Sequence, residues 1–327
     1  MSPEKVSTNP SISKDVSKAA TIPLQDLLEL ARFWKPAGVL AFHIPLVYGA
    51  LLSEVNEPQS VNSQHFLTIN GWLLLSSFFQ RAAACAWNDA ADYKFDKQVA
   101  RTRNRPIPRG SISSAAARLW AATLTLLWMR CVYATESRAA MWTLIPNFAF
   151  NMAYPYMKRV TDWPQIFLGF TFSCNVLTGY MMMTQSAWEL VIVDPMIFKS
   201  LAWTVLAQVA FTCFYDTIYA YQDYEDDKAA GVRSMALRLG NDLNGKISIA
   251  IMAVMQVSFL AMIGSAIKVG GAYFLLTCGG SALLATIALA SCNLKDPDDC
   301  GSWFKKCLVY GGVIQCGGLL ADCLRKG

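Results

Sequence analysis

Charged residues are scarce in this sequence. Only 16% of its 327 residues are Asp, Glu, Lys or Arg, whereas 54% are hydrophobic, and the mean hydropathy is +0.32. Soluble domains carry about 25% charged residues, so the composition argues against a soluble two-domain enzyme and against an intrinsically disordered chain. The net charge is only +5 and the basic residues are not gathered on one polar face, so we expect no nucleic-acid binding.

Cysteine patterns typical of metal sites are missing as well. The ten cysteines are scattered through apolar stretches without a single C-x-x-C pair. The four nearest the end of the chain are Cys300, Cys307, Cys316 and Cys323, and they do not have the spacing of a zinc site. We therefore expect most cysteines to act as small buried hydrophobic residues.

Residues 1–22 lack both an apolar stretch and arginine. They are rich in Ser, Thr, Pro and Lys, which predicts a disordered polar tail ahead of one transmembrane domain over residues 23–327. Without an apolar stretch the segment does not resemble a secretory signal. The lack of arginine, together with Glu4 and Asp15, also argues against a mitochondrial transit peptide.

Apolar runs of membrane-spanning length repeat through the rest of the chain. One helical crossing needs about 20 apolar residues, and nine runs approach that length: 24–52, 67–88, 114–135, 139–157, 163–184, 198–221, 243–267, 270–292 and 303–322. The predicted fold class is therefore all-α, a polytopic membrane protein with about nine transmembrane helices. Lys and Arg are concentrated in the even-numbered loops, which the positive-inside rule places in the cytoplasm together with the N-terminus.

Two acidic clusters lie where the second and the sixth apolar runs end. In the first cluster, Asn88, Asp92 and Asp96 are four residues apart, so they share one face of a helix. The second cluster consists of Asp216, Tyr219, Asp223 and Asp227. Stacked carboxylates repel one another, and at the end of a membrane span they mark a functional site.

Carboxylate and amide oxygens are hard ligands that suit Mg²⁺, which is often held by one or two carboxylates together with substrate phosphates. One such cluster alone is also explained as a solvated helix end. Two acidic clusters of similar composition, each at the same end of an apolar run, are better explained as ligands of Mg²⁺ ions that bind a diphosphate.

Basic residues follow the acidic clusters on the same predicted membrane face. We expect four of them to contact the diphosphate: Arg101, Arg105, Lys158 and Arg233. Guanidinium groups match the oxygens of a phosphate. Positive-inside topology by itself also accounts for basic residues in these loops, so that explanation stays open.

Five segments, in order along the chain, match motifs of one protein family. Residues 32–38 match R-x-x-K-P-x-G, residues 88–96 match N-D-x-x-D-x-x-x-D, and residues 101–110 match R-T-x-x-R-P-x-P-x-G. Residues 216–227 carry a second acidic motif, and residues 231–240 match G-V-[KR]-S-x-A-x-x-x-G. In these segments the sequence resembles the UbiA family of intramembrane prenyltransferases. The residues around the second acidic motif resemble those of fungal members of the family.

The resemblance implies nine helices around a central cavity, with Mg²⁺ as cofactor. It implies that the metal and diphosphate are held by Asn88, Asp92, Asp96, Asp223 and Asp227, with Asp89 and Asp216 as further candidates, and that Tyr219 lies near the reacting carbon. For the acceptor it suggests Arg32 and Asn175. A helix-end arginine and a hydrogen-bonded interhelical asparagine remain the alternative explanations for these two residues.

The resemblance also indicates a reaction. We expect transfer of a farnesyl or geranylgeranyl group from its diphosphate to a carbon of a polyketide-derived phenolic acid or hydroxy-pyrone, in meroterpenoid biosynthesis. The expected location is the endoplasmic-reticulum membrane, with the active site facing the cytoplasm. The alternatives are a 4-hydroxybenzoate polyprenyltransferase of ubiquinone biosynthesis and, as a non-enzyme, a membrane transporter. A transporter predicts acidic residues deep inside broken helices, whereas here they lie at helix ends.

Overall fold

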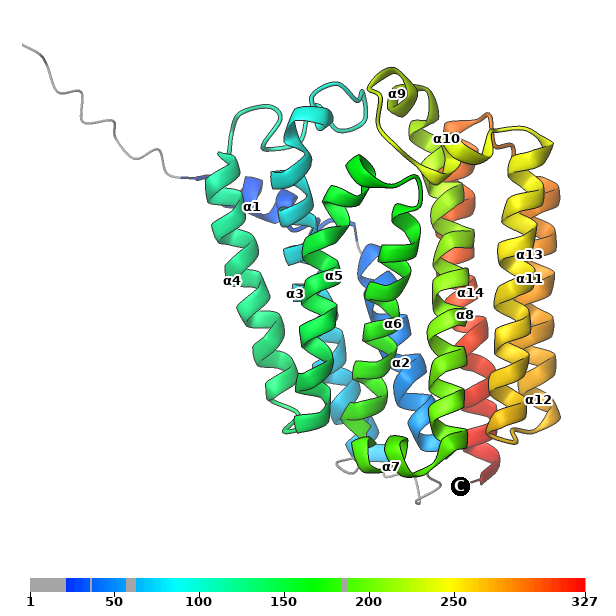
Figure 1. Cartoon of the computed structure of the whole chain (residues 1–327). Coiled ribbons are helices and arrows are strands. Elements are labelled where there is room, and N and C mark those ends of the chain that lie inside the picture. Colours follow the sequence, from blue (N-terminus) through cyan, green and yellow to red (C-terminus); the bar gives the residue numbers. More distant parts are fainter. Residues whose placement is uncertain (1–21, 36, 57–62, 184–186, 327) are drawn as a thin grey trace, which may run out of the picture.

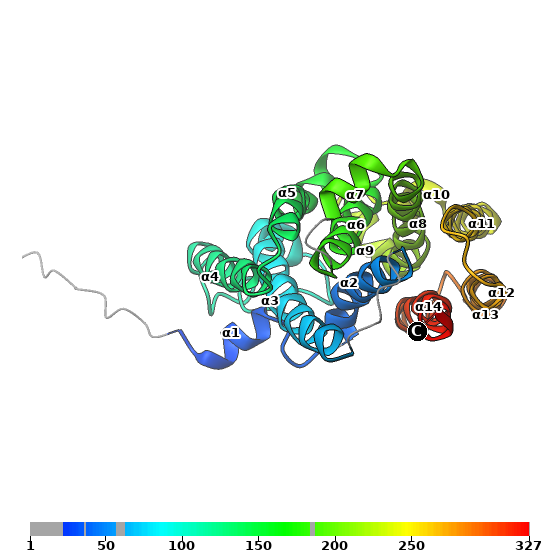
Figure 2. The same cartoon turned by 90° about the horizontal axis from the view of Figure 1, so that it is seen from below.

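The computed structural model describes residues 22–35, 37–56, 63–183 and 187–326. Apart from Ile22, the predicted polar tail therefore lies outside the described residues. The described chain is helical, and its long helices run side by side in one bundle (Figures 1 and 2).

Within those residues, nine helical segments are long enough to cross a membrane. They are α2 (Ala37–Asn56), α3 (Ser63–Asp96), α4 (Ser114–Tyr133), α5 (Arg138–Val160), α6 (Pro164–Met183), α8 (Pro195–Ala220), α11 (Leu243–Ala266), the continuous run of α12 (Gly271–Tyr273), η2 (Phe274–Gly279) and α13 (Gly280–Ser291), and α14 (Pro297–Lys326). Six of them are also apolar enough to span by composition, whereas α3, α4 and α5 are more polar. The all-α membrane fold is confirmed, and the count of nine is an approximate one.

Most predicted bounds agree with the helices to within a few residues. The exceptions are the start of the chain, the end of α3, which continues past residue 88 to Asp96, and the start of α14, which begins at Pro297 and not at residue 303. The first apolar run was expected to be continuous, but it is divided into α1 (Leu24–Leu30) and α2. Arg32 adopts a left-handed conformation with φ of 55°, and the residue before Pro36 is sterically disfavoured from helical geometry. The chain therefore turns between the two helices, and α1 lies at the side of the bundle next to α3, close to one end (Figures 1 and 2).

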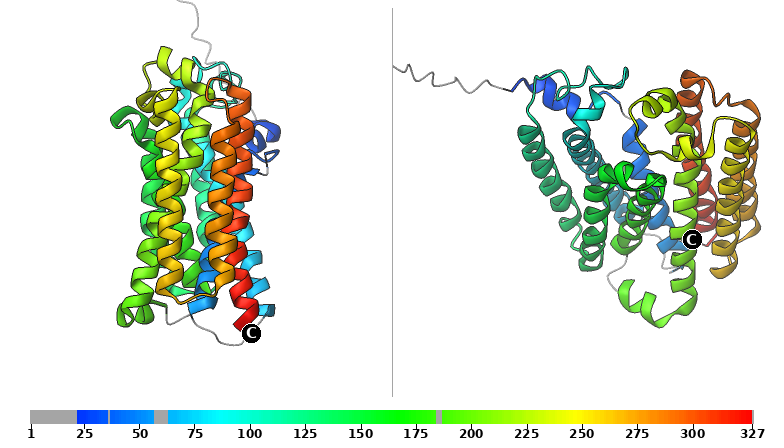
Figure 3. Two further views of the ribbon diagram at one scale, coloured as in Figure 1. Left: turned by 90° about the vertical axis from the view of Figure 1, so that its right-hand side faces the viewer. Right: turned by 45° about the horizontal axis from the view of Figure 1, so that its top comes forward.

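Short elements gather at the end of the bundle where α3 and α8 finish. They are α1, η1 (Tyr221–Asp223), α9 (Tyr224–Ala229) and α10 (Met235–Leu239), and Figure 3 shows them from above. The C-terminal end of α14 and the short helix α7 (Ala187–Val193) both lie at the opposite end of the bundle (Figure 1). Both acidic clusters therefore lie at one end of the bundle, as the sequence predicted.

Small residues let α2 and α6 pack closely at the centre of the bundle. A Cβ atom on Gly49 would collide with the backbone carbonyl of Val176, and one on Gly179 would collide with that of Leu46. Such close approach is typical of membrane helices. The ten cysteines are free thiols, eight of them buried, which agrees with the expectation that most are small hydrophobic residues.

Candidate active site

Direct contacts join the two acidic clusters. The guanidinium group of Arg101, in the loop after α3, donates hydrogen bonds to both carboxylate oxygens of Asp223, with Nε to Oδ1 at 2.9 Å. The backbone N–H of Ala100 donates to the carboxylate of Asp226 at 3.3 Å. Motifs more than 120 residues apart in the sequence thus form one site at the end of the bundle (Figure 3).

Local structure in each loop positions these basic groups. The Thr102 hydroxyl donates to the carbonyl of Asp96 at 2.9 Å, which turns the chain back over the end of α3. Gly231 has a φ of 67°, a conformation that glycine adopts without a steric penalty. The chain there turns so that the Arg233 N–H reaches the carbonyl of Lys158, at 3.2 Å.

Asp89 is the most buried acidic residue of the first cluster, with only 1% of its surface exposed. It accepts hydrogen bonds from Arg32 at 2.7 and 2.8 Å and from Arg105 at 2.9 Å. A buried carboxylate needs such partners to offset the loss of water. Burial alone would lower the pKa of Arg32, but Asp89 and the other neighbouring groups together outweigh burial and raise the pKa. The structure therefore places Asp89 between two arginines, as an ion-pair anchor.

The other carboxylates of the first motif have fewer partners. Asp96 accepts one hydrogen bond from Arg105 at 3.1 Å, and Asp92 accepts one from Arg159 at 3.2 Å. Arg159 was not among the predicted diphosphate contacts, although its position next to Lys158 was visible in the sequence. Each carboxylate keeps oxygen lone pairs that these hydrogen bonds do not use.

Lys158 is half-buried near the end of α5, beside both motifs. Its positive charge interacts electrostatically with Asp92, Asp223 and Asp227. Within the described residues it forms no direct ion pair with any of them. Arg233, by contrast, donates to the carbonyl of Val160 at 2.8 Å, where a basic side chain satisfies the end of a helix. Its predicted contact with a diphosphate stays a prediction.

Tyr219 lies beside the link between the motifs. The Arg101 guanidinium is 5.5 Å from the centre of its ring, within cation–π range. Burial alone would lower the pKa of Arg101, but the hydrogen bond and the charge of Asp223, together with Tyr219, outweigh burial and raise the pKa. The Tyr219 ring also contacts Phe304 of α14, with centroids 4.6 Å apart.

The side-chain oxygens of the two motifs fit a Mg²⁺ site that is completed by the phosphates of a bound substrate. Among the described residues, no three His, Cys, Asp or Glu side chains converge closely enough to hold a metal ion by themselves. Mg²⁺ typically takes one or two carboxylates together with phosphates and water. Buried Asp92, Asp96 and Asp227 supply carboxylates. Among the residues that the structure describes, the buried amide oxygen of Asn88 has no hydrogen-bond partner, which leaves it able to coordinate a cation.

The two predicted acceptor residues have protein partners. Arg32 binds Asp89, as described above. Asn175 donates to the carbonyl of Phe42 at 3.2 Å and accepts from Asn147 at 2.6 Å. These contacts join α2, α5 and α6, which is the interhelical role that the sequence left open. Acceptor binding by Arg32 and Asn175 remains a prediction.

Arg81 is a basic residue that the sequence reasoning missed. It is 7% exposed inside α3, packs against Gly38, and donates to the carbonyl of Arg32 at 3.0 Å. In the part of the chain that the structure describes, no carboxylate lies within ion-pair distance of its guanidinium group. A charged residue inside a spanning helix is itself a signal of function, and that signal was available in the sequence.

Comparisons with known proteins agree with this geometry. The chain is 32% identical to the UbiA prenyltransferase claS of Ampulloclitocybe clavipes over 97% of its own length and 95% of that protein. It is 31% identical to the mitochondrial 4-hydroxybenzoate polyprenyltransferase of Schizosaccharomyces pombe over 85% of the chain and 74% of that protein. These two relatives point to the same type of enzyme.

Solved structures share the fold. A UbiA homologue from Aeropyrum pernix superposes with a TM-score of 0.67 at 22% identity, covering 86% of this chain and 97% of that one. A homologue from Archaeoglobus fulgidus, solved with GPP and Mg²⁺, has a TM-score of 0.61 at 17% identity and covers 89% of this chain and 99% of that one. The model of the UbiA prenyltransferase family matches residues 43–310. The chain therefore belongs to the UbiA prenyltransferase family and is an integral membrane enzyme.

Proposed function

We propose that this prenyltransferase moves a farnesyl or geranylgeranyl group from its diphosphate to a ring carbon of a polyketide-derived aromatic or pyrone acceptor, with Mg²⁺ as cofactor. The observation that carries the proposal is the ion pair between Arg101 and Asp223, which joins the loop after the first acidic motif to the second motif. Cations and carboxylates brought together from both motifs suit a group that is itself polyanionic and bound through metal ions.

Asn88, Asp92, Asp96, Asp223 and Asp227 are the residues that would hold the metal. When bound, Mg²⁺ neutralises negative charge on the diphosphate as it leaves. Arg101 donates a hydrogen bond to the carboxylate of Asp223 in the second motif, and Arg105 donates one to the carboxylate of Asp96 in the first. Their guanidinium groups are in position to exchange a carboxylate for a phosphate oxygen, because the two anions present similar geometry. Lys158 adds a fixed positive charge near the leaving group.

The chemistry follows from the donor. The bond between the allylic carbon and the diphosphate oxygen breaks, and its electron pair leaves with the diphosphate. A ring carbon of the acceptor supplies the electron pair of the new carbon–carbon bond, and the ring then loses a proton. Preorganised positive charge at the diphosphate lowers the barrier because negative charge grows there in the transition state.

The acceptor side is supported by Arg81. Its buried guanidinium lies next to Arg32, whose own charge is offset by Asp89. An anionic group on the acceptor would offset the remaining charge of Arg81, since an unpaired buried charge is costly. A phenolic acid carries such a group, so this arrangement favours acidic aromatic acceptors.

A role in meroterpenoid biosynthesis rests on likeness to fungal prenyltransferases, including claS and the prenyltransferase stbC of Stachybotrys bisbyi at 30% identity. The similarity to 4-hydroxybenzoate polyprenyltransferases keeps ubiquinone biosynthesis as a second candidate. We further propose the endoplasmic-reticulum membrane as the location of the enzyme. The end of the bundle with the acidic clusters would face the cytoplasm, because basic residues are concentrated in the loops at that end.

The test uses microsomes that lack the activity and express the full chain. They receive Mg²⁺, farnesyl or geranylgeranyl diphosphate, and one of three acceptors: 4-hydroxybenzoate, an orsellinic-type acid or a 4-hydroxy-2-pyrone. Mass spectrometry identifies the prenylated product. We expect product with a polyketide-type acceptor. Product with 4-hydroxybenzoate alone would assign the enzyme to quinone biosynthesis, and no product with any pair would refute the proposed donors and acceptors.

A further inference from the structure

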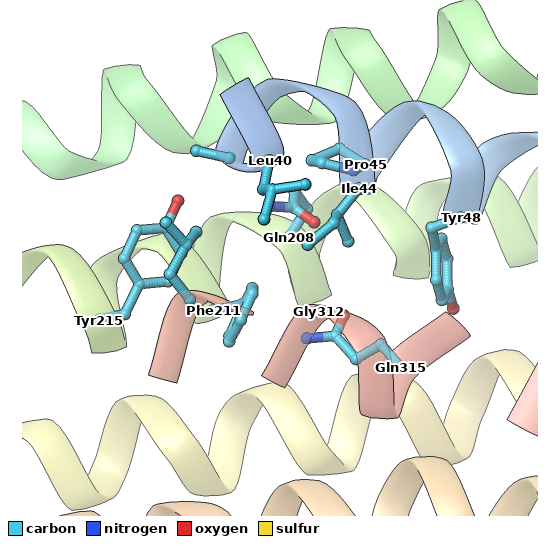
Figure 4. Close-up of a pocket in the computed structure, with 11 residues that line it drawn as sticks. Leu40, Ile44, Pro45, Tyr48, Gln208, Phe211, Tyr215, Gly312 and Gln315 are labelled. Carbon is cyan, nitrogen blue, oxygen red and sulfur yellow. The ribbon is translucent and has the colours of Figure 1, made fainter. Parts of the chain in front are cut away.

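Two hollows in the described part of the chain differ greatly in size. The first lies between α2, α8 and α14 and measures about 10 Å³, which is roughly the space of one water molecule. Gln208 and Gln315 line it (Figure 4). The second is an open pocket of about 340 Å³ beside the start of α14, and this volume is within the range of small-molecule sites. Of the two, only the second can hold a ligand larger than water.

This second hollow, the α14 pocket, has a polar and mainly basic lining. It is formed by Gln222 of η1 and, from α14, by Asp298, Gly301, Ser302, Lys305 and Lys306. Both lysines are exposed, and within the described residues neither forms an ion pair. Two positive charges thus face the single negative charge of Asp298, and the Ser302 hydroxyl adds a hydrogen-bond donor. The lining suits an anion.

The α14 pocket lies where α14 reaches the membrane surface. The helix begins at Pro297 and contacts η1, at the same end of the bundle as both acidic motifs. The Lys306 ammonium group is 4.4 Å from the centre of the Trp303 ring. Tryptophan is enriched at the membrane–water interface, and lysine extends its charged end to the headgroups from there. The pocket is therefore at the depth of the lipid headgroups.

An exposed apolar face of α14 continues from the pocket into the membrane. Lys306, Val313, Leu320 and Leu324 are separated by seven, seven and four residues, so they share one face of the helix. The three apolar residues are 59%, 46% and 75% exposed. At 1.5 Å per residue, Lys306 and Leu324 are about 27 Å apart, close to the thickness of the hydrocarbon core. Lipid chains therefore cover this face, and the pocket lies at its end.

We propose that the α14 pocket binds the headgroup of an anionic phospholipid, with a fatty-acyl chain along the exposed face of α14. The phosphate lies between Lys305 and Lys306. Basic pockets at the cytoplasmic side of membrane helices typically bind anionic headgroups, and anionic lipids are enriched in the cytoplasmic leaflet. In a zwitterionic lipid, the positive group of the headgroup opposes the attraction of its phosphate to the lysines. The site is additional to the proposed reaction, and only the choice of leaflet rests on the proposed orientation.

A lipid in this pocket borders the second acidic motif. The side-chain amide of Gln222 donates to the carbonyl of Tyr219 at 3.1 Å. A Cβ atom on Gly301 would lie 2.6 Å from the amide oxygen of Gln222, so α14 and η1 are in close contact here. The residue after Gln222 is Asp223, which pairs with Arg101. We therefore expect a bound headgroup to hold η1 against α14 and to stabilise the protein.

The test uses the purified full chain in a neutral detergent, without prenyl diphosphate or acceptor, so its result is independent of the proposed reaction. Native mass spectrometry measures the Kd of phosphatidylserine and of phosphatidylcholine with identical acyl chains, and thermal unfolding is followed in parallel. We expect phosphatidylserine to bind more tightly and to raise the Tm. Glycerophosphoserine, the soluble headgroup without acyl chains, should do neither.

Two matched double variants locate the site. Lys305→Gln with Lys306→Gln removes both charges of the pocket and should weaken phosphatidylserine binding about 25-fold, because each lysine near an anionic headgroup contributes about fivefold. Lys228→Gln with Lys295→Gln removes two exposed charges at the same end of the bundle but outside the pocket, and should leave the affinity unchanged. Ser302→Tyr fills the pocket without changing its charge and should also weaken binding.

Several results would overturn the proposal. Equal affinity for phosphatidylserine and phosphatidylcholine would show that the lysines do not select an anionic headgroup. Equal weakening in the two double variants would show that the lipid responds to total charge and not to the α14 pocket. Binding of glycerophosphoserine as tightly as the whole lipid would indicate a site for a soluble phosphate ester. Lipid binding without an increase in Tm would refute the stabilising contact with η1.

Discussion

Asp89 and Asp92 are three residues apart in the same motif, yet the structure predicts opposite consequences when each is changed to asparagine. Asp89 is 1% exposed and neutralises Arg32 and Arg105, whose side chains are 13% and 19% exposed. Asp89→Asn would leave both guanidinium groups without their buried partner. In the described part of the chain Asp92 accepts one hydrogen bond, from Arg159, whose side chain is 40% exposed, so its replacement costs little stability.

The magnitude for Asp89→Asn follows from its burial. Breaking a buried ion pair by removing one partner costs about 3–5 kcal/mol. For a chain of this size that corresponds to a decrease in Tm of roughly 4–7 °C. A thiol-reactive dye measures it directly, because eight of the ten free cysteines are buried and become reactive on unfolding. Glu225→Gln, at an exposed position of α9, is the control and should unfold at the temperature of the wild type.

The same samples also decide the role of each residue in metal binding. Titration of activity with Mg²⁺ should show a normal Mg²⁺ requirement for whatever Asp89→Asn enzyme remains folded, and a weakened one for Asp92→Asn. The reasoning would be refuted by the reverse pattern, in which Asp89→Asn unfolds like the wild type and has lost its response to Mg²⁺. Asp89 would then be a metal ligand and not an anchor.

Three further outcomes are expected. Asp92→Asn and Asp223→Asn should each lower kcat by about 10²–10³-fold, as the loss of a group that stabilises transition-state charge does; steady-state assays in microsomes measure this, and turnover equal to the wild type in both would contradict the site. Chelation by EDTA should abolish turnover and added Mg²⁺ should restore it, whereas full activity in EDTA would exclude the proposed cofactor. Gly179→Val should destabilise the protein by more than about 2 kcal/mol because α2 must move away from α6. In dye-based melting, Gly71→Ala is its control, because a Cβ at that position meets nothing, and similar Tm values for the two variants would show that the helices do not pack closely there.

The long helices were predictable because their determinants are local. A membrane span needs a run of apolar residues of sufficient length, so the bounds of α6, α8 and α11 agree with the predicted runs to within a few residues. The division of the first run into α1 and α2 was missed. It depends on the left-handed turn at Arg32, and that turn accompanies a contact with Asp89, which is distant in the sequence.

The sequence by itself determined the membrane fold, the family and the motif residues, because helical periodicity places Asn88, Asp92 and Asp96 on one face without reference to the rest of the chain. Only the tertiary structure decided which acidic side chain pairs with which basic side chain. It paired Asp89 with Arg32, paired Arg101 with Asp223, and brought Asn147 of α5 into hydrogen-bond contact with Asn175 of α6. Ion pairs and pockets depend on separations of a few ångströms between helices distant in sequence, and no local pattern specifies those separations.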